Sequence, residues 1–264
     1  MPREEFGPGQ SVLYTNVESC QWWRMPKITY LNAAGEEVPS TTTIIGKYKD
    51  MGGLMHFAWS EGKAGRGLNE SRDRAGDIGS MLHGMIEAYI RAINWGPPAD
   101  SKSEDIDLAM RLFTTFKRWW AENKIEVVAT EVSLVSEDYQ YGGTLDLVAR
   151  FPIVHPAASV GATFLGLMDW KTSSAYYQEM LLQMAAYRQL WYERNMSPGI
   201  VRATLVLFSK TDAKMKIYPV TSEDMDLAFK KFLLLRGAYD MEAAINKSVK
   251  ETRRAAISYD YSAG

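Results

Sequence analysis

The chain has 264 residues, of which 46% are hydrophobic and 23% charged, so it can bury a substantial core in one domain or two. Its net charge of -2 gives no overall basic excess of the kind that coats nucleic acid, although acidic metal ligands could offset basic phosphate contacts in the sum. The single cysteine, Cys20, excludes an internal disulfide framework and an iron-sulfur cluster held by four cysteines of this chain.

No stretch of the sequence resembles a membrane anchor. A spanning helix needs about 18 or more apolar residues with few charges, and no segment reaches that length. The first ten residues, "MPREEFGPGQ", lack the apolar region of a signal peptide. The expected location is therefore the cytoplasm, without a membrane partner.

The first part of the chain is predicted to be mainly helical. Residues 1–40 form an irregular lead-in by their Gly, Pro and polar content, and Ser40 is expected to start a helix in "VPSTTTIIGKYKD". Apolar residues at helical spacing predict a helix over residues 79–93, "GSMLHGMIEAYIRAI", in which His83 and Glu87 lie one turn apart.

A proline-rich break separates this helix from the next. "WGPPADSKSED" is followed by an amphipathic segment that ends at "WWAENK", and Ser101 with Glu104 is expected to cap its start. These segments make up an N-terminal part over residues 1–124.

From residue 125 the pattern changes to strands. "IEVVATEVSLV" and "YQYGGTLDLVARF" alternate around a polar turn and predict an antiparallel hairpin, and the next strand ends in "MDWK". A helix is expected over residues 174–195, followed by the strands "IVRATLVLFSK" and "KMKIYPV".

The C-terminal part, residues 221–264, is predicted to contain one helix, which Thr221 and Asp224 cap, and a mobile tail after Ser248. Together with a sheet core over residues 125–220, this order predicts an α/β (α+β) fold in a single domain. The expected architecture is a mixed sheet flanked by helices, with an N-terminal helical extension.

Two acids at strand positions suggest a site. Asp146 lies between Leu145 and Leu147, which should point into the core if Asp146 points away from it. In "MDWK", Asp169 and Lys171 should share one face of their strand. Converging carboxylates repel each other and are usually held by a divalent cation. The alternative for the acid and lysine is a solvated strand end with a weak ion pair.

Four spaced motifs carry a family resemblance. "GTLD", "DWKTS" and the helix "QMAAYRQLWY", with the upstream "GSMLHGMIEAY", resemble the PD-(D/E)XK nuclease superfamily and, within it, the RecB-like exonuclease branch. The resemblance extends over roughly residues 38–210 and implies a restriction-endonuclease-like core. The chain departs from the pattern at Leu145, where the superfamily name has proline, and it lacks the cysteines of the members with an iron-sulfur cluster, so none is expected.

The resemblance implies roles for particular residues. Lys171 would position the attacking water, and Glu131 could be a ligand or a supporting acid. The catalytic set is Asp146, Asp169, Lys171, Gln183, Tyr187 and Glu131. The metal ligands are His83, Asp146, Asp169 and the carbonyl of Trp170, with Mg²⁺ as the expected ion and Mn²⁺ as a substitute.

Basic residues upstream of His83 could contact DNA phosphates, although each alone is more typical of a solvated loop. These residues are Lys63, Arg66, Arg72 and Arg74. His56 and His155 match no motif and are expected to be ordinary surface or packed residues, and Glu87 a charge on the helix face.

The leading hypothesis is a metal-dependent deoxyribonuclease, most simply an exonuclease of recombination, repair or phage DNA processing. Its partners would be DNA, single- or double-stranded and with ends, and a recombination or single-strand-binding protein, in the host cytoplasm if phage-encoded. The alternatives are a non-catalytic DNA-binding or assembly module on the same fold and a sheet domain for a small acidic ligand. Digestion polarity, strand preference, exo- against endonuclease action, DNA against RNA, the number of metals and the oligomeric state stay open.

Overall fold

The computed structural model describes residues 28–50, 52–65, 67–153, 159, 161–195 and 199–255. Cys20, Arg66 and His155 lie outside these ranges, as do residues 1–27 of the expected lead-in. The helices of the described part are α1 (Thr41–Lys47), α2 (Gly52–Lys63), α3 (Leu68–Arg91), α4 (Ser103–Asn123), α5 (Gln178–Asn195) and α6 (Ser222–Arg254). Its strands are β1 (Tyr30–Leu31), β2 (Glu37–Val38), β3 (Glu126–Ser136), β4 (Tyr141–Pro152), β5 (Thr163–Lys171), β6 (Arg202–Phe208) and β7 (Met215–Val220).

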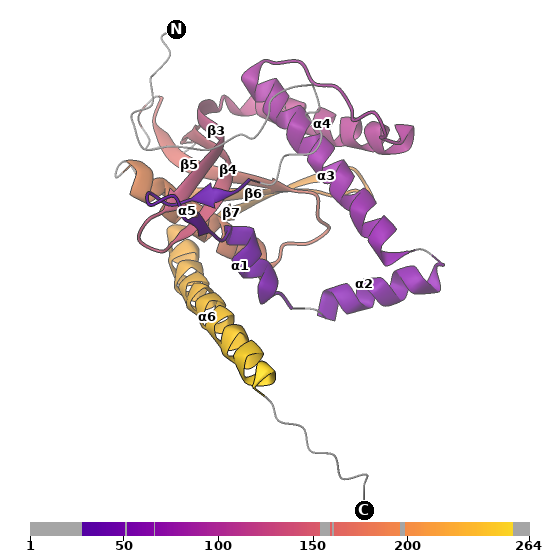
Figure 1. Cartoon of the computed structure of the whole chain (residues 1–264). Coiled ribbons are helices and arrows are strands. Elements are labelled where there is room, and N and C mark those ends of the chain that lie inside the picture. The colour runs from indigo at the N-terminus through magenta and orange to yellow at the C-terminus, as the bar shows by residue number, and fades with distance from the viewer. Residues whose placement is uncertain are drawn as a thin grey trace, which may run out of the picture.

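The centre of the molecule is a five-stranded sheet in the order β3-β4-β5-β6-β7 (Figure 1). All neighbouring strands run antiparallel except β5 and β6, which are parallel. The parallel pair is connected through α5, because two parallel neighbours need a crossover rather than a tight hairpin. The predicted mixed sheet flanked by helices is confirmed. Among the described helices, none has both the length and the apolar character needed to cross a bilayer.

Helices cover both faces of this sheet and form two separate cores. On one face, α3 and α4 contribute Leu82 and Phe116 to a cluster that includes Trp170 of β5. On the other face, α1, α5 and α6 pack with Leu167 of β5, and Phe232 of α6 is fully buried there. Both sides of β5 are therefore buried, which accounts for the near-continuous apolar run that precedes "DWK" in the sequence.

The start of α1 agrees with its prediction, whereas those of α3 and α4 differ from theirs. Ser40 caps α1 as predicted, because its Oγ accepts a hydrogen bond from Thr43 N at 3.0 Å. The predicted Ser101 cap of α4 is wrong. Ser101 N donates to Pro98 O within the preceding turn, so the helix begins only at Ser103, after Lys102. The α3 helix extends well before Gly79, since it begins at Leu68.

The last two helices differ from the prediction at one end each. The α5 helix starts at Gln178 rather than at residue 174, because Ser173 Oγ forms local hydrogen bonds with Ala175 that compete with helix formation. Thr221 and Asp224 form the predicted capping box of α6. The expected mobile tail after Ser248 is wrong as far as Arg254, because good helix formers continue α6 to that residue.

Leu145 and Leu147 are both fully buried, as expected, but they belong to different cores. Leu145 packs with α5 on one face of the sheet, whereas Leu147 packs with α3 and α4 on the other. Strict alternation therefore breaks at Asp146. The neighbouring strand is irregular at the same level, because Glu131 of β3, opposite Asp146, has a positive φ of 49° and is not among the paired residues of the β3–β4 register.

Close packing of β4 against α5 leads to a first prediction. A Cβ on Gly143 would lie 2.5 Å from Tyr187 Cε1 and 3.0 Å from Leu190 Cδ1. Gly143→Ala should therefore lower the free energy of unfolding by about 1–3 kcal/mol. Gly237→Ala, in α6 with nothing within 4 Å of the added carbon, should raise it by about 0.5–1 kcal/mol. Urea denaturation of both variants checks this; equal effects would contradict the close packing.

Candidate active site

The two strand acids meet where β4 and β5 separate. The ladder between these strands runs from Pro152 paired with Thr163 to Leu147 paired with Met168, and Asp146 and Asp169 are the next residues on their strands. At this fork a carboxylate replaces the missing backbone partner, because Trp170 N donates to Asp146 Oδ2 at 3.0 Å. The fork thus places both acids at one point of the sheet.

Asp169 and Lys171 lie on the same face of β5, as predicted, with Trp170 on the opposite face. The Lys171 ammonium is 2.6 Å from Asp169 Oδ2. The Asp169 side chain is 0% exposed and that of Lys171 26%, so the alternative of a solvated strand end is wrong for the acid. Burial raises the pKa of Asp169 to about 6, and Lys171 opposes that rise. Burial alone would lower the pKa of Lys171, but the attraction of Asp169 and Asp146 raises it overall.

His83 reaches this point from α3. Its Nε2 lies 2.8 Å from the carbonyl oxygen of Trp170, and its Nδ1 lies 3.9 Å from Asp146 Oδ2. A carbonyl only accepts, so Nε2 carries the proton and Nδ1 presents its lone pair toward Asp146. Burial, together with Lys171, lowers the pKa of His83 to about 4. The imidazole is therefore neutral near pH 7, which is the form that binds metals.

Glu131 joins the group from β3. Ligand atoms of His83, Glu131 and Asp146 lie within 4.8 Å of one another. Glu131 Oε1 is buried without a hydrogen-bond partner among the described residues, and the positive φ of this residue is costly for a side chain with a Cβ. Burial, with Asp146 nearby, raises the pKa of Glu131 to about 9, and burial also raises the pKa of Asp146. Grouped acids with such raised pKa values are typical of a cation site.

This donor set fits a divalent metal ion. Two carboxylates and a neutral imidazole supply the oxygen and nitrogen ligands that Mg²⁺ and Mn²⁺ accept. His83, Glu131 and Asp146 can hold such an ion together, and the orphaned Glu131 oxygen is an unused ligand atom. Asp169 contacts Lys171 through Oδ2 while its Oδ1 is buried without a hydrogen-bond partner among the described residues, and the Trp170 carbonyl accepts from His83. The ligand roles of Asp169 and Trp170 thus stay predictions.

The α5 residues of the predicted site lie together beneath the acids. Gln183 Nε2 donates to the hydroxyl of Tyr187 at 2.6 Å, and both side chains are buried. Burial raises the pKa of Tyr187 well above its usual value, and the charges of Asp169 and Asp146 raise it further. The phenol therefore stays protonated, and its O–H remains a donor within electrostatic reach of Asp169 and Asp146.

The predicted phosphate contacts are dispersed. Lys63 ends α2 with its ammonium 4.4 Å from the centre of the Trp59 ring. The guanidinium of Arg74 forms ion pairs with Asp105 at 2.7 Å and Glu104 at 2.8 Å. These pairs link α3 to α4, so Arg74 has a structural role. Arg72 lies in α3, and its side chain is not among those described.

A hollow of about 590 Å³ opens beside His83, Glu131 and Asp146. Its remaining lining includes residues that sequence reasoning did not assign to the site. Tyr30 and Thr144 are joined across it by a 2.9 Å hydrogen bond between their hydroxyl oxygens. The other lining residues include Ser40, Thr42 and Thr43 at the start of α1 and Tyr239 of α6. In the sequence, these hydroxyl residues belong to the run "STTT" and to the threonine of "GGT", which could have suggested that they line the site.

Comparison with known proteins adds little to this geometry. No family model matches the chain, and no curated protein matches it. Among solved structures, a candidate exonuclease from Eubacterium rectale is similar over 77% of this chain and 70% of its own, with 11% identity and a TM-score of 0.34. The protein named SSO0001 is similar over 50% of this chain and 60% of its own, with 12% identity and a TM-score of 0.26. Neither likeness is strong enough to support an assignment of activity.

The cluster predicts which residues bind a metal. Calorimetry should detect Mn²⁺ binding to the wild type, and Asp146→Asn should weaken it by about tenfold or more, because the amide keeps the shape but loses the charge. His83→Ala should weaken it similarly by removing the nitrogen ligand. Asp107→Asn, an exposed acid of α4, is the matched control and should bind as the wild type does. Unchanged binding by Asp146→Asn would contradict the site.

Proposed function

We propose that the chain is a divalent-metal-dependent nuclease that hydrolyses phosphodiester bonds. The observation that carries the proposal is the convergence of Asp146, His83 and Glu131 beside the buried pair of Asp169 and Lys171. A metal ion held there would lower the pKa of a bound water and neutralise charge on a phosphate. These are the two requirements of phosphodiester hydrolysis.

The side chains around the metal cluster either stabilise charge on the phosphate or hold the catalytic groups in position. Lys171 supplies a positive charge that can stabilise the developing charge on the phosphate or orient the attacking water. Asp169 holds that ammonium by the 2.6 Å contact. The hydrogen bond from His83 Nε2 to the Trp170 carbonyl fixes the imidazole, so its Nδ1 stays directed at Asp146. The packing of α5 under the fork fixes the phenol of Tyr187, which the Gln183 amide orients.

The finer assignment rests on the motif resemblance. We propose an exonuclease of DNA recombination, repair or phage DNA processing, formed by a single domain and acting on DNA. The main alternative is a DNA-binding or assembly module without catalysis, in which metal and DNA binding would occur without turnover. The presence of both acids and the lysine favours catalysis.

Cleavage should depend on an added cation. End-labelled linear, circular and single-stranded DNA should be tested with Mg²⁺, Mn²⁺, Ca²⁺ or EDTA. We expect turnover with Mg²⁺ and Mn²⁺ and none in EDTA, because uncompensated acids repel both each other and phosphate. Ca²⁺ should bind without supporting turnover, since its looser coordination positions the water poorly. Full cleavage in EDTA would refute the proposal, and spared circular DNA would identify an exonuclease.

Removal of Lys171 should separate chemistry from binding. Lys171→Gln keeps a hydrogen-bond donor for the buried Asp169 but removes the charge, so single-turnover cleavage should fall by about a hundredfold or more. Mn²⁺ affinity and DNA affinity should persist, because the ligands stay in place. Lys171→Ala should also lose stability, by about 1–3 kcal/mol, since it leaves Asp169 buried without a partner.

The matched control is Lys216→Gln, which removes an exposed lysine from β7. This variant should cleave at the wild-type rate. Near-normal cleavage by Lys171→Gln would show that the lysine only balances the charge of Asp169.

A further inference from the structure

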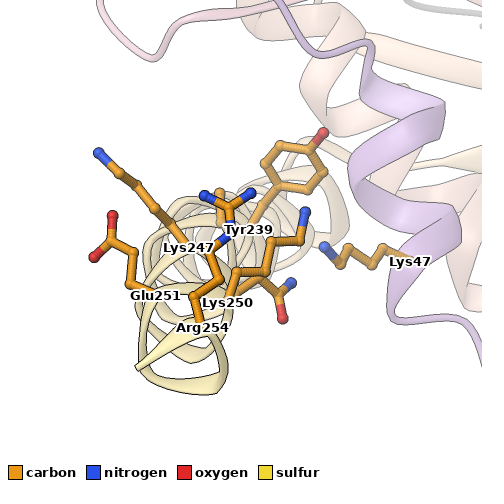
Figure 2. A pocket seen from close by; sticks show the side chains of 8 residues that line it. Lys47, Tyr239, Lys247, Lys250, Glu251 and Arg254 are labelled. Carbon is orange, nitrogen blue, oxygen red and sulfur yellow. The ribbon is translucent and has the colours of Figure 1, made fainter. Parts of the chain in front are cut away.

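A second hollow, of about 500 Å³, lies between the C-terminal half of α6 and the end of α1. Its lining includes Lys47 from α1 and Lys247, Lys250 and Arg254 from α6. Figure 2 looks along α6 and shows Lys47 pointing from α1 toward this helix, with Lys250 reaching toward α1 and Lys247 extending to the other side. In Figure 1 this part of α6 extends beyond the sheet. We call the hollow the α6 groove.

The positive charge of the α6 groove is concentrated. From Lys247 to Arg254 the helix carries four cations and a single acid, Glu251, whereas the whole chain has a net charge of -2. Lys47 is balanced by Glu242, at 3.0 Å. None of the three basic α6 residues that line the groove forms an ion pair with a described carboxylate, and all three are exposed. Their charge is therefore available to an anionic ligand.

The α6 groove and the hollow at the candidate active site share one lining residue. Tyr239 lines the groove and also lines the hollow that contains His83, Glu131 and Asp146. Its half-buried ring carries the Lys47 ammonium 5.0 Å from its centre. A ligand that passes over Tyr239 would touch both hollows.

The spacing of the cations fits a repeating anion. Lys247, Lys250 and Arg254 follow one another by three and four residues and so share one face of the helix. Because an α-helix rises about 1.5 Å per residue, they extend over about 10 Å. A nucleic-acid strand in a duplex rises about 3.4 Å per phosphate, so this distance matches about three phosphates.

We infer that the α6 groove binds the phosphate backbone of the nucleic acid whose scissile bond lies at the metal cluster. The inference rests on the proposed nuclease function and names the path of its substrate. A phosphate chain is favoured over a membrane surface, because a planar bilayer does not enter a groove between two helices, whereas a strand can run along it and on past Tyr239. The contacts are electrostatic and independent of sequence.

The test compares binding of a labelled oligonucleotide to two triple variants, without divalent cations and over a range of salt concentrations. The groove variant is Lys247→Ala, Lys250→Ala and Arg254→Ala. The control variant, Lys216→Ala, Lys230→Ala and Arg118→Ala, removes the same residue types from exposed positions outside the groove. Alanine favours the helix, so α6 should stay folded, which circular dichroism and melting temperature would verify.

The groove variant should bind DNA at least about tenfold more weakly near 0.1 M salt. Its slope of log affinity against log salt should fall by about 2–3, because each lost phosphate contact removes about 0.7–0.9 from the slope. The control variant should bind as the wild type does. Exchange of Lys247 and Lys250 for Arg, and of Arg254 for Lys, should preserve binding, since it keeps the charges.

Several results would overturn the inference: wild-type affinity of the groove variant, an equal loss in both triple variants, or no DNA binding by the wild type. Loss of binding to phosphatidylserine vesicles, with DNA binding intact, would assign the α6 groove to a lipid surface instead. Asp146→Asn separates this inference from the proposed function, because it should abolish cleavage but keep the salt slope. A wild type that binds DNA through the groove but never cleaves it would refute the nuclease and leave the groove standing.

Discussion

The burial of carboxylates at the fork between β4 and β5 is the constraint on which the site depends. Asp169 is fully buried, and the pKa values of Asp169, Asp146 and Glu131 are all raised by their removal from water. Lys171 offsets part of this cost at one end of the group, and a cation could offset the rest at the other. Grouped buried acids with raised pKa values are characteristic of functional sites, and here they lie beside a lysine and a histidine.

The two cores hold this unfavourable group in place from opposite faces of the sheet. One core includes Trp170 and α3, which brings His83 to the fork, and the other includes α5, which brings Tyr187 under it. A slip of one residue between β4 and β5 would exchange the two faces of β5, burying Lys171 against α3 and removing Asp169 from Asp146. The apolar side chains of the strand thus fix the register of its acids.

Sequence periodicity could predict that Asp169 and Lys171 share a face, because alternation is a local property of any strand. It could not predict the burial of Asp169, since that depends on α5 covering a strand end which, taken alone, looks solvated. Nor could it predict the positive φ of Glu131, or the break in alternation opposite it in β4 that puts Leu145 and Leu147 into different cores. Both features arise from contacts between distant segments, as does the Tyr239 contribution of α6.

Although the net charge of the chain is only -2, its acids and its cations gather at different places: acids at the metal cluster and cations on the C-terminal half of α6. Cations placed directly among Asp146, Glu131 and His83 would compete with a metal for the same ligands, as Lys171 does for Asp169. Apart from Lys171, which Asp169 holds, further phosphate contacts therefore interfere least with the ligands when they lie outside the acid cluster. At about 0.15 M salt, exposed charges more than about 8 Å apart are largely screened from each other. The basic residues on the C-terminal half of α6 line a different hollow from that of His83, Glu131 and Asp146, so they can attract a polyanion without being among the metal ligands.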